Sequence, residues 1–197
     1  LTGVKSPVEA AVNGAMVFDQ ASPAYAQAVS AGDVATVLLG TNDDRIWGDS
    51  HVDLFHSGLC ALLAWLCIPE ASRIRARSAG VTETGTWGNT VAYGMGRVSS
   101  ENGAAISFQL HGPIAYLGLI KQAASYGACD IYVDSILKAQ FSAHSPAPAT
   151  GKGLTYGPAL VRIDDLGDGA HVFDIVVTSA NGAPNYLYFD WAGVPSA

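Results

Sequence analysis

The hydrophobic positions along the chain follow two different patterns. Residues 1–75 contain one continuous apolar run followed by a helical repeat, whereas short runs from about residue 78 onward alternate between apolar and polar side chains. A continuous run suits a strand buried on both faces, and alternation suits a strand buried on one face. The chain is therefore expected to combine an α/β part with an antiparallel β-sandwich.

The first clear element in the first part is the apolar run at residues 33–40, which predicts a strand of a parallel sheet. A helix over residues 50–68 follows, capped by Asp49 or Ser50 and ended by Pro69. Its apolar residues recur at steps of three and four: Val52, Phe55, Leu59, Leu62, Leu63 and Leu66. A strand, a loop and a helix make half of a βαβ unit. Such a sheet needs more strands, which we expect outside residues 1–197.

The second part alternates with period two at residues 105–110, 130–134, 170–178 and 185–191, with Gly- and Asn-rich turns between the runs. Many short strands with regular turns predict an all-β antiparallel sandwich of the jelly-roll type, without helices. The predicted organisation is an α/β domain at 1–77, the sandwich at 78–192, and a return to the α/β domain at 193–197.

Charge and cysteine usage narrow the classes of partner. The net charge is −7 and no Lys/Arg cluster is present, so nucleic acid and anionic membranes are excluded as expected partners. The longest apolar stretch, residues 59–68, is too short to span a membrane. Cys60 and Cys67 are seven helical residues, about 10 Å, apart, so they are expected to be free thiols. His51 and His56 are five apart, which does not suit a shared metal.

Candidate chemistry lies at Gly40-Thr-Asn-Asp43, directly after the predicted buried strand. Sites in open α/β sheets form beyond the carboxyl ends of the strands. There an Asn side chain can donate a hydrogen bond to a developing oxyanion. The alternative is a polar turn in which Asn and Asp cap backbone groups.

The Gly40–Asp43 segment resembles the third sequence block of SGNH (GDSL-type) hydrolases, and the segment at residues 11–20 is similar to the second block. The resemblance implies a partial, flavodoxin-like doubly wound sheet. It also implies an oxyanion hole made by the Gly14 backbone N–H and the Asn42 side chain, with Asp43 supporting the loop. The implied function is part of a serine esterase acting on acyl groups, O-acetyl above all, of a polysaccharide, without metal or cofactor.

The sandwich resembles the carbohydrate-binding-type insert found in some bacterial and phage members of this family. This resemblance implies a glycan-contacting module and a secreted, cell-surface or virion location. The alternative is a non-catalytic carbohydrate-binding protein, or a virion or surface structural protein with a vestigial hydrolase part. Assembly into a homo-oligomer stays open.

Two blocks of the family are missing in their usual context. The nucleophile block G-D-S does not precede Gly14, and the D-x-x-H block does not follow Trp191. A companion segment carrying both blocks is therefore expected. Gly48-Asp-Ser50 and Asp168-Gly-Ala-His171 spell the two motifs, but Ser50 suits a helix cap and His171 leads into a strand. A rearranged triad from these residues stays open, because triads are defined by geometry rather than by order.

Four aromatic residues in or beside predicted loops are candidates for contact with sugar rings, whose apolar faces match a flat aromatic surface. The alternative for each of them is packing in the core or at a sheet edge. Trp191, at the end of a predicted strand, is expected in the core. The four candidates are Trp87, Tyr93, Tyr126 and Tyr156.

Overall fold

The chain folds into two antiparallel sheets and one long helix, in a computed structural model that describes residues 52–89, 96–122, 125–144 and 156–195. The helix is α4 (Val52–Cys67), and a 3₁₀ turn, η2 (Glu70–Ser72), follows it. The strands are β1 (Arg73–Arg75), β2 (Thr82–Thr84), β3 (Gly88–Asn89), β4 (Arg97–Ser99), β5 (Ala105–His111), β6 (Ala115–Gln122), β7 (Ala128–Val133), β8 (Ile136–Ser142), β9 (Tyr156–Ile163), β10 (Ala170–Val177) and β11 (Leu187–Gly193).

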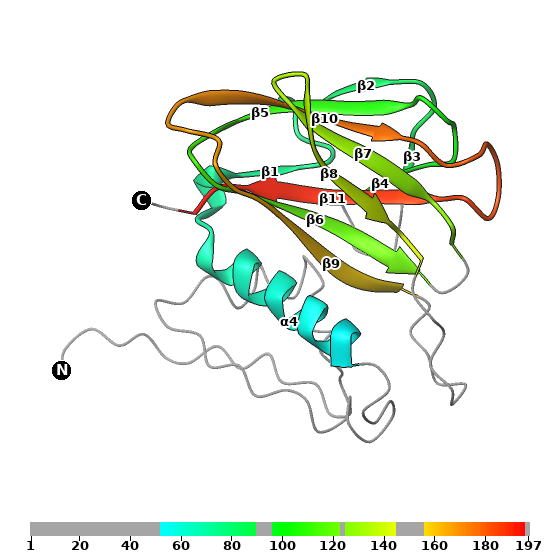
Figure 1. The fold of residues 1–197 in the computed structure, drawn as a ribbon, viewed down its shortest axis with the longest axis horizontal. Coiled ribbons are helices and arrows are strands. Elements are labelled where there is room, and N and C mark those ends of the chain that lie inside the picture. Colours follow the sequence, from blue (N-terminus) through cyan, green and yellow to red (C-terminus); the bar gives the residue numbers. More distant parts are fainter. Residues whose placement is uncertain (1–51, 90–95, 123–124, 145–155, 196–197) are drawn as a thin grey trace.

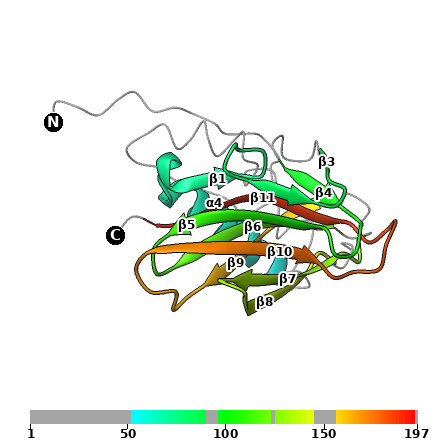
Figure 2. The same cartoon turned by 90° about the horizontal axis from the view of Figure 1, so that it is seen from above.

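The two sheets face each other as a sandwich (Figure 1). The first sheet has the order β3-β4-β11-β6-β9, and β1 pairs with the far end of β11. The second sheet has the order β2-β5-β10-β7-β8. Figure 2 shows β5 and β10 running side by side across the second sheet. The predicted antiparallel sandwich is therefore confirmed.

The core lies between the two sheets and joins them through aromatic stacking. The ring of Phe108 on β5 stacks on Phe173 of the neighbouring β10, with ring centres 5.5 Å apart. It also stacks on Phe189 of β11 in the opposite sheet, at 5.4 Å. All three rings are at most 3% exposed. Parallel stacks of this kind add to the gain from burying the rings.

Helix α4 covers the outer face of the first sheet, lying along β9 in Figure 1. Trp65 of α4 is 2% exposed and meets the ring of Trp191 edge-on, with ring centres 5.3 Å apart. The Arg73 guanidinium lies 4.1 Å from the centre of the Trp65 ring and donates a hydrogen bond to the Trp65 carbonyl at 3.1 Å. Both faces of the first sheet are therefore covered.

The sandwich begins and ends at one place. Arg73 of β1 pairs with Gly193 of β11, and the Val194 N–H donates to the Ser72 carbonyl at 3.1 Å. The first strand of this sheet thus begins at Arg73. The domain boundary at residue 78 stays a prediction.

Several predicted elements agree with the structure and others do not. The helix predicted over residues 50–68 is found as α4, and the four alternating runs are found as β5, β7, β10 and β11. Strand β6 was not predicted, because α4 covers its outer face and its sequence, AYLGLIKQ, lacks alternation. The α/β strand at residues 33–40 lies outside the described residues.

Gly118 on β6 makes the contact between α4 and the sheet possible. A Cβ atom at this position would lie 2.2 Å from Nε1 of Trp191. We expect Gly118→Ala to displace Trp191 and to lower the free energy of unfolding by about 1–3 kcal/mol, the usual cost of overpacking. Urea unfolding followed by tryptophan fluorescence measures the change. The matched control is Gly88→Ala on β3, whose Cβ would meet its nearest atom at 3.5 Å; equal effects of the two substitutions would contradict this account.

Candidate functional site

Three loops meet at one end of the sandwich around the side chain of Ser125. Its Oγ donates to the Tyr186 carbonyl at 2.5 Å and accepts from the N–H groups of Tyr186 at 3.1 Å and Gly127 at 3.2 Å. A hydroxyl can donate one hydrogen bond and accept two, so this buried group is fully used. The segment after β6 is therefore fixed to the segment before β11.

Gly127 allows these segments to approach closely. A Cβ atom at this position would lie 2.1 Å from the Tyr186 carbonyl oxygen, so no larger residue fits without moving the backbone. The Tyr126 N–H donates to the Pro184 carbonyl at 3.2 Å, and the Ala143 N–H donates to the Gly127 carbonyl at 2.8 Å. The backbone that carries Tyr126 is thus held from both sides.

Tyr126 projects from this framework and is 59% exposed. Its ring stacks on His144, with ring centres 4.8 Å apart and planes 13° from parallel. One face of the Tyr126 ring is therefore covered by His144, while the side chain as a whole stays largely exposed. Because the stack presets the ring orientation, a ligand would cost little side-chain entropy on binding.

His144 is oriented by a hydrogen bond between its Nδ1 and the Ser125 carbonyl, at 3.2 Å. A carbonyl oxygen only accepts, so Nδ1 carries a hydrogen, and in this tautomer Nε2 bears a lone pair. Nε2 has no hydrogen-bond partner within the described parts of the chain. The exposed pair therefore offers an aromatic surface beside an acceptor for a hydroxyl group.

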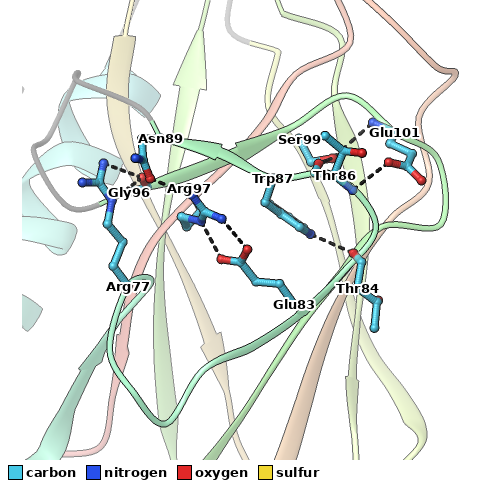
Figure 3. A network of polar contacts seen from close by, with 10 residues as sticks. All are labelled: Arg77, Glu83, Thr84, Thr86, Trp87, Asn89, Gly96, Arg97, Ser99 and Glu101. Atoms are coloured by element: carbon cyan, nitrogen blue, oxygen red, sulfur yellow. Dashed lines mark hydrogen bonds and ion pairs between the residues drawn. The ribbon is translucent and has the colours of Figure 1, made fainter.

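The other predicted aromatic residues lie in different surroundings. Tyr156 begins β9 and pairs with Gln122, whose N–H donates to the Ala143 carbonyl at 2.8 Å, so its backbone belongs to the same end of the sandwich as Tyr126. Trp87 is 9% exposed, packs into the core and donates from Nε1 to the Thr84 carbonyl at 3.0 Å (Figure 3). This burial favours the packing interpretation of Trp87. Tyr93 lies outside the described residues.

The polar network around Trp87 joins the edges of the two sheets (Figure 3). Arg97 of β4 in the first sheet makes a two-pronged ion pair with Glu83 of β2 in the second, and it also donates to the Asn89 side chain at 2.6 Å. Glu101 accepts a hydrogen bond from the Thr86 N–H at 2.7 Å. Interaction with the Thr86 side chain, and then this backbone hydrogen bond, lower the pKa of its carboxyl. These contacts join β2 of the second sheet to β4 of the first sheet, so the network has a structural role.

His171, which the sequence places in an Asp168-x-x-His171 motif, contacts a different carboxylate in the structure. Its Nδ1 lies 2.7 Å from Oδ2 of Asp134, in the turn between β7 and β8. Its Nε2 lies 3.3 Å from the Gly167 carbonyl. The hydrogen bond to Asp134 is the main cause that raises the pKa of His171. Since acceptors engage both ring nitrogens, neither is free to take a proton from a serine.

The predicted oxyanion-hole residues Gly14 and Asn42, the supporting Asp43, and Ser50 lie outside the described residues. The three cysteines are free thiols, as expected. Within the four described ranges, no three His, Cys, Asp or Glu side chains are grouped closely enough to hold a metal ion. No helix in the described part of the chain is long and apolar enough to cross a membrane.

Asp190 is a buried titratable residue that the sequence analysis missed. It lies at an irregularity in the pairing of β11 with β6 and is 5% exposed. Burial raises the pKa of its carboxyl to about 8, against the opposing effect of the positive charges of Arg75 and Arg77. The available signal was a single acidic residue inside the apolar run LYFDWAG.

Comparison with known proteins gives no family assignment. No protein-family model matches the chain, and no curated protein matches it. Among solved structures, a family two carbohydrate esterase from Cellvibrio japonicus is similar at 9% identity and a TM-score of 0.49, over 64% of this chain and 33% of that chain. The chain thus spans about a third of that esterase.

Two other similar structures differ in how much of their length is matched. The CBM36-1 domain of a multidomain xylanase from the hindgut metagenome of Trinervitermes trinervoides has 18% identity and a TM-score of 0.48, over 64% of this chain and 97% of the domain. A two-domain esterase active on acetylated mannans has 14% identity and a TM-score of 0.47, over 74% of this chain and 46% of that chain. At these values they place the chain in no family.

The burial of Asp190 predicts a stability that depends on pH. Its folded pKa, about 8, is far above the value of about 4 in an unfolded chain, so the folded state holds the proton more tightly and loses stability as pH rises from about 4 to 8. We expect Asp190→Asn to be more stable than wild type at pH 8, by several kcal/mol at most, with the gain vanishing near pH 4. Chemical unfolding at several pH values measures it. The exposed Asp168→Asn is the control, and a gain that does not change with pH would refute the account.

Proposed function

We propose that the chain is part of a serine esterase that removes acyl groups, O-acetyl above all, from a polysaccharide, and that the sandwich contacts the glycan. The observation that carries the glycan contact is the exposed Tyr126 ring, stacked on His144 at 4.8 Å. The apolar face of a pyranose matches such a ring, and Nε2 of His144 can accept a hydrogen bond from a neighbouring hydroxyl.

The positions where the sandwich begins and ends support its role as an insert. Ser72 and Val194 are hydrogen-bonded neighbours at 3.1 Å. A module whose first and last residues lie together can be inserted in a loop of another domain without separating the parts of that domain. The same closeness suits a parent domain whose sequence blocks lie on both sides of the sandwich.

The proposed catalytic contribution of the chain is the oxyanion hole. In this proposal the Gly14 N–H and the Asn42 side chain donate hydrogen bonds to the oxygen of the tetrahedral intermediate, and Asp43 holds the loop. These donors act most strongly where negative charge develops in the transition state. A companion segment supplies the serine nucleophile and the catalytic histidine.

A second candidate is a non-catalytic glycan-binding protein with a vestigial hydrolase part. Both ring nitrogens of His171 face hydrogen-bond acceptors, which argues against a rearranged triad within this chain. This observation favours a chain that binds a glycan without hydrolysing it by such a triad. The exposed Tyr126 surface serves either function, so the two candidates differ only in turnover.

Tyr126→Ala is expected to weaken glycan binding about three- to tenfold, since an aromatic contact contributes about 0.5–1.5 kcal/mol beyond burial. Isothermal titration against acetylated and deacetylated polysaccharides measures the dissociation constants. Tyr126→Phe keeps the ring and is expected to bind nearly as well as wild type. Tyr132→Ala, on β7 of the second sheet, is the remote control. Unchanged affinity in Tyr126→Ala would rule out the proposed contact.

Asn42→Ala is expected to lower kcat of the parent protein by about 10²–10³, the usual effect of losing one oxyanion-hole donor. Release of p-nitrophenol from p-nitrophenyl acetate measures the rate. The control is Asn102→Ala, at an exposed position. Equal rates in wild type and Asn42→Ala would remove the oxyanion role, and binding of polysaccharide without any hydrolysis would select the second candidate.

A further inference from the structure

Helix α4 has two apolar surfaces, and the sandwich covers only one of them. The covered surface consists of Ala61, Leu62 and Trp65, which are at most 3% exposed. The other surface, here called the outer stripe, consists of Phe55, Leu59 and Leu63, spaced four residues apart. Leu63 is 42% exposed, and Phe55 and Leu59 are partly exposed, whereas Leu66 packs against the cluster of Leu62, Trp65 and Trp191. The apolar residues that recur at helical spacing in the sequence therefore lie mainly on a surface that the sandwich does not cover.

The composition of α4 indicates that the outer stripe is covered in the folded protein. Its 16 residues include a single charged one, Asp53. A helix with one face in water normally carries charged and polar residues there, and a helix that is apolar on all sides is buried on all sides. The sandwich accounts for one side of α4, so a second apolar surface is needed for the other.

We propose that the outer stripe is the docking surface for the predicted strand at residues 33–40 of the same chain. This run, DVATVLLG, has apolar residues at both sets of alternate positions, so each face of the strand needs an apolar cover. Residues 41–51 can span up to roughly 36 Å, enough for the helix to return along the strand. The lengths also match, at about 26 Å for eight strand residues and about 24 Å for α4.

Helix α4 is then shared by two sheets. Trp65 joins it to the sandwich through Trp191, and the outer stripe joins it to the sheet that ends at Gly40 and Asn42. A single helix thereby fixes the glycan-contacting module relative to the proposed oxyanion hole. The docking does not depend on esterase activity, because a vestigial hydrolase part would need the same cover.

Two natural thiols, Cys60 and Cys129, provide the test. Cys60 is partly exposed and borders the outer stripe between Leu59 and Leu63, whereas Cys129 is 1% exposed in the core of the sandwich. Labelling of the full chain by a small maleimide, followed for each thiol by peptide mass spectrometry, is compared with labelling in denaturant. We expect Cys60 to react at least tenfold more slowly in the native protein.

Charge placed in the strand should open the docking surface. We expect either Val37→Asp or Leu38→Asp, whichever faces the helix, to restore the fast labelling of Cys60 while Cys129 stays protected, which shows that the sandwich remains folded. The control Ser30→Asp adds the same charge before the strand and should leave Cys60 protected. Labelling of native Cys60 at the denatured rate would overturn the proposal. So would protection that persists in both strand variants, or protection that appears only at high protein concentration, which would indicate a second copy.

Discussion

The structure depends on covering the first sheet on both faces. One face packs against the second sheet through Phe189 and Phe108, and the other packs against α4 through Trp191 and Trp65. Helix α4 and the second sheet therefore bury opposite faces of the same strands. This is why every residue of β11 is buried, and why a glycine is required at position 118 beneath the Trp191 ring.

The same constraint brings the beginning and the end of the sandwich together. Strand β1 follows α4 after a single 3₁₀ turn and pairs with the last strand, β11, so the chain leaves the module beside the point where it arrived. The loops proposed to contact a glycan lie elsewhere, around Ser125 and Gly127, where close backbone contacts hold Tyr126 in place. A supported, exposed ring on a module with adjacent ends fits the proposed function, in which the module holds a polymer for chemistry in another domain.

The buried carboxyl of Asp190 costs stability at neutral and alkaline pH. Its high pKa arises from loss of hydration within the covered sheet, which the arginines nearby do not offset. Groups with strongly shifted pKa values often occur at functional sites.

The sequence by itself determined the sandwich and the long helix, and it placed Tyr126 among four candidate aromatic residues without deciding which of them is exposed. Alternation, turn residues and helical spacing are local signals, and they survive in β5, β7, β10 and α4. Only the tertiary structure decided what depends on distant partners. It buried Trp87, paired His171 with Asp134 in place of Asp168, and showed β6 as a strand without alternation. The physical reason is that the burial of a strand face depends on which distant segment packs on it, and so does the pKa of any titratable group on that face. The pattern of residues along the chain does not say which segment that is.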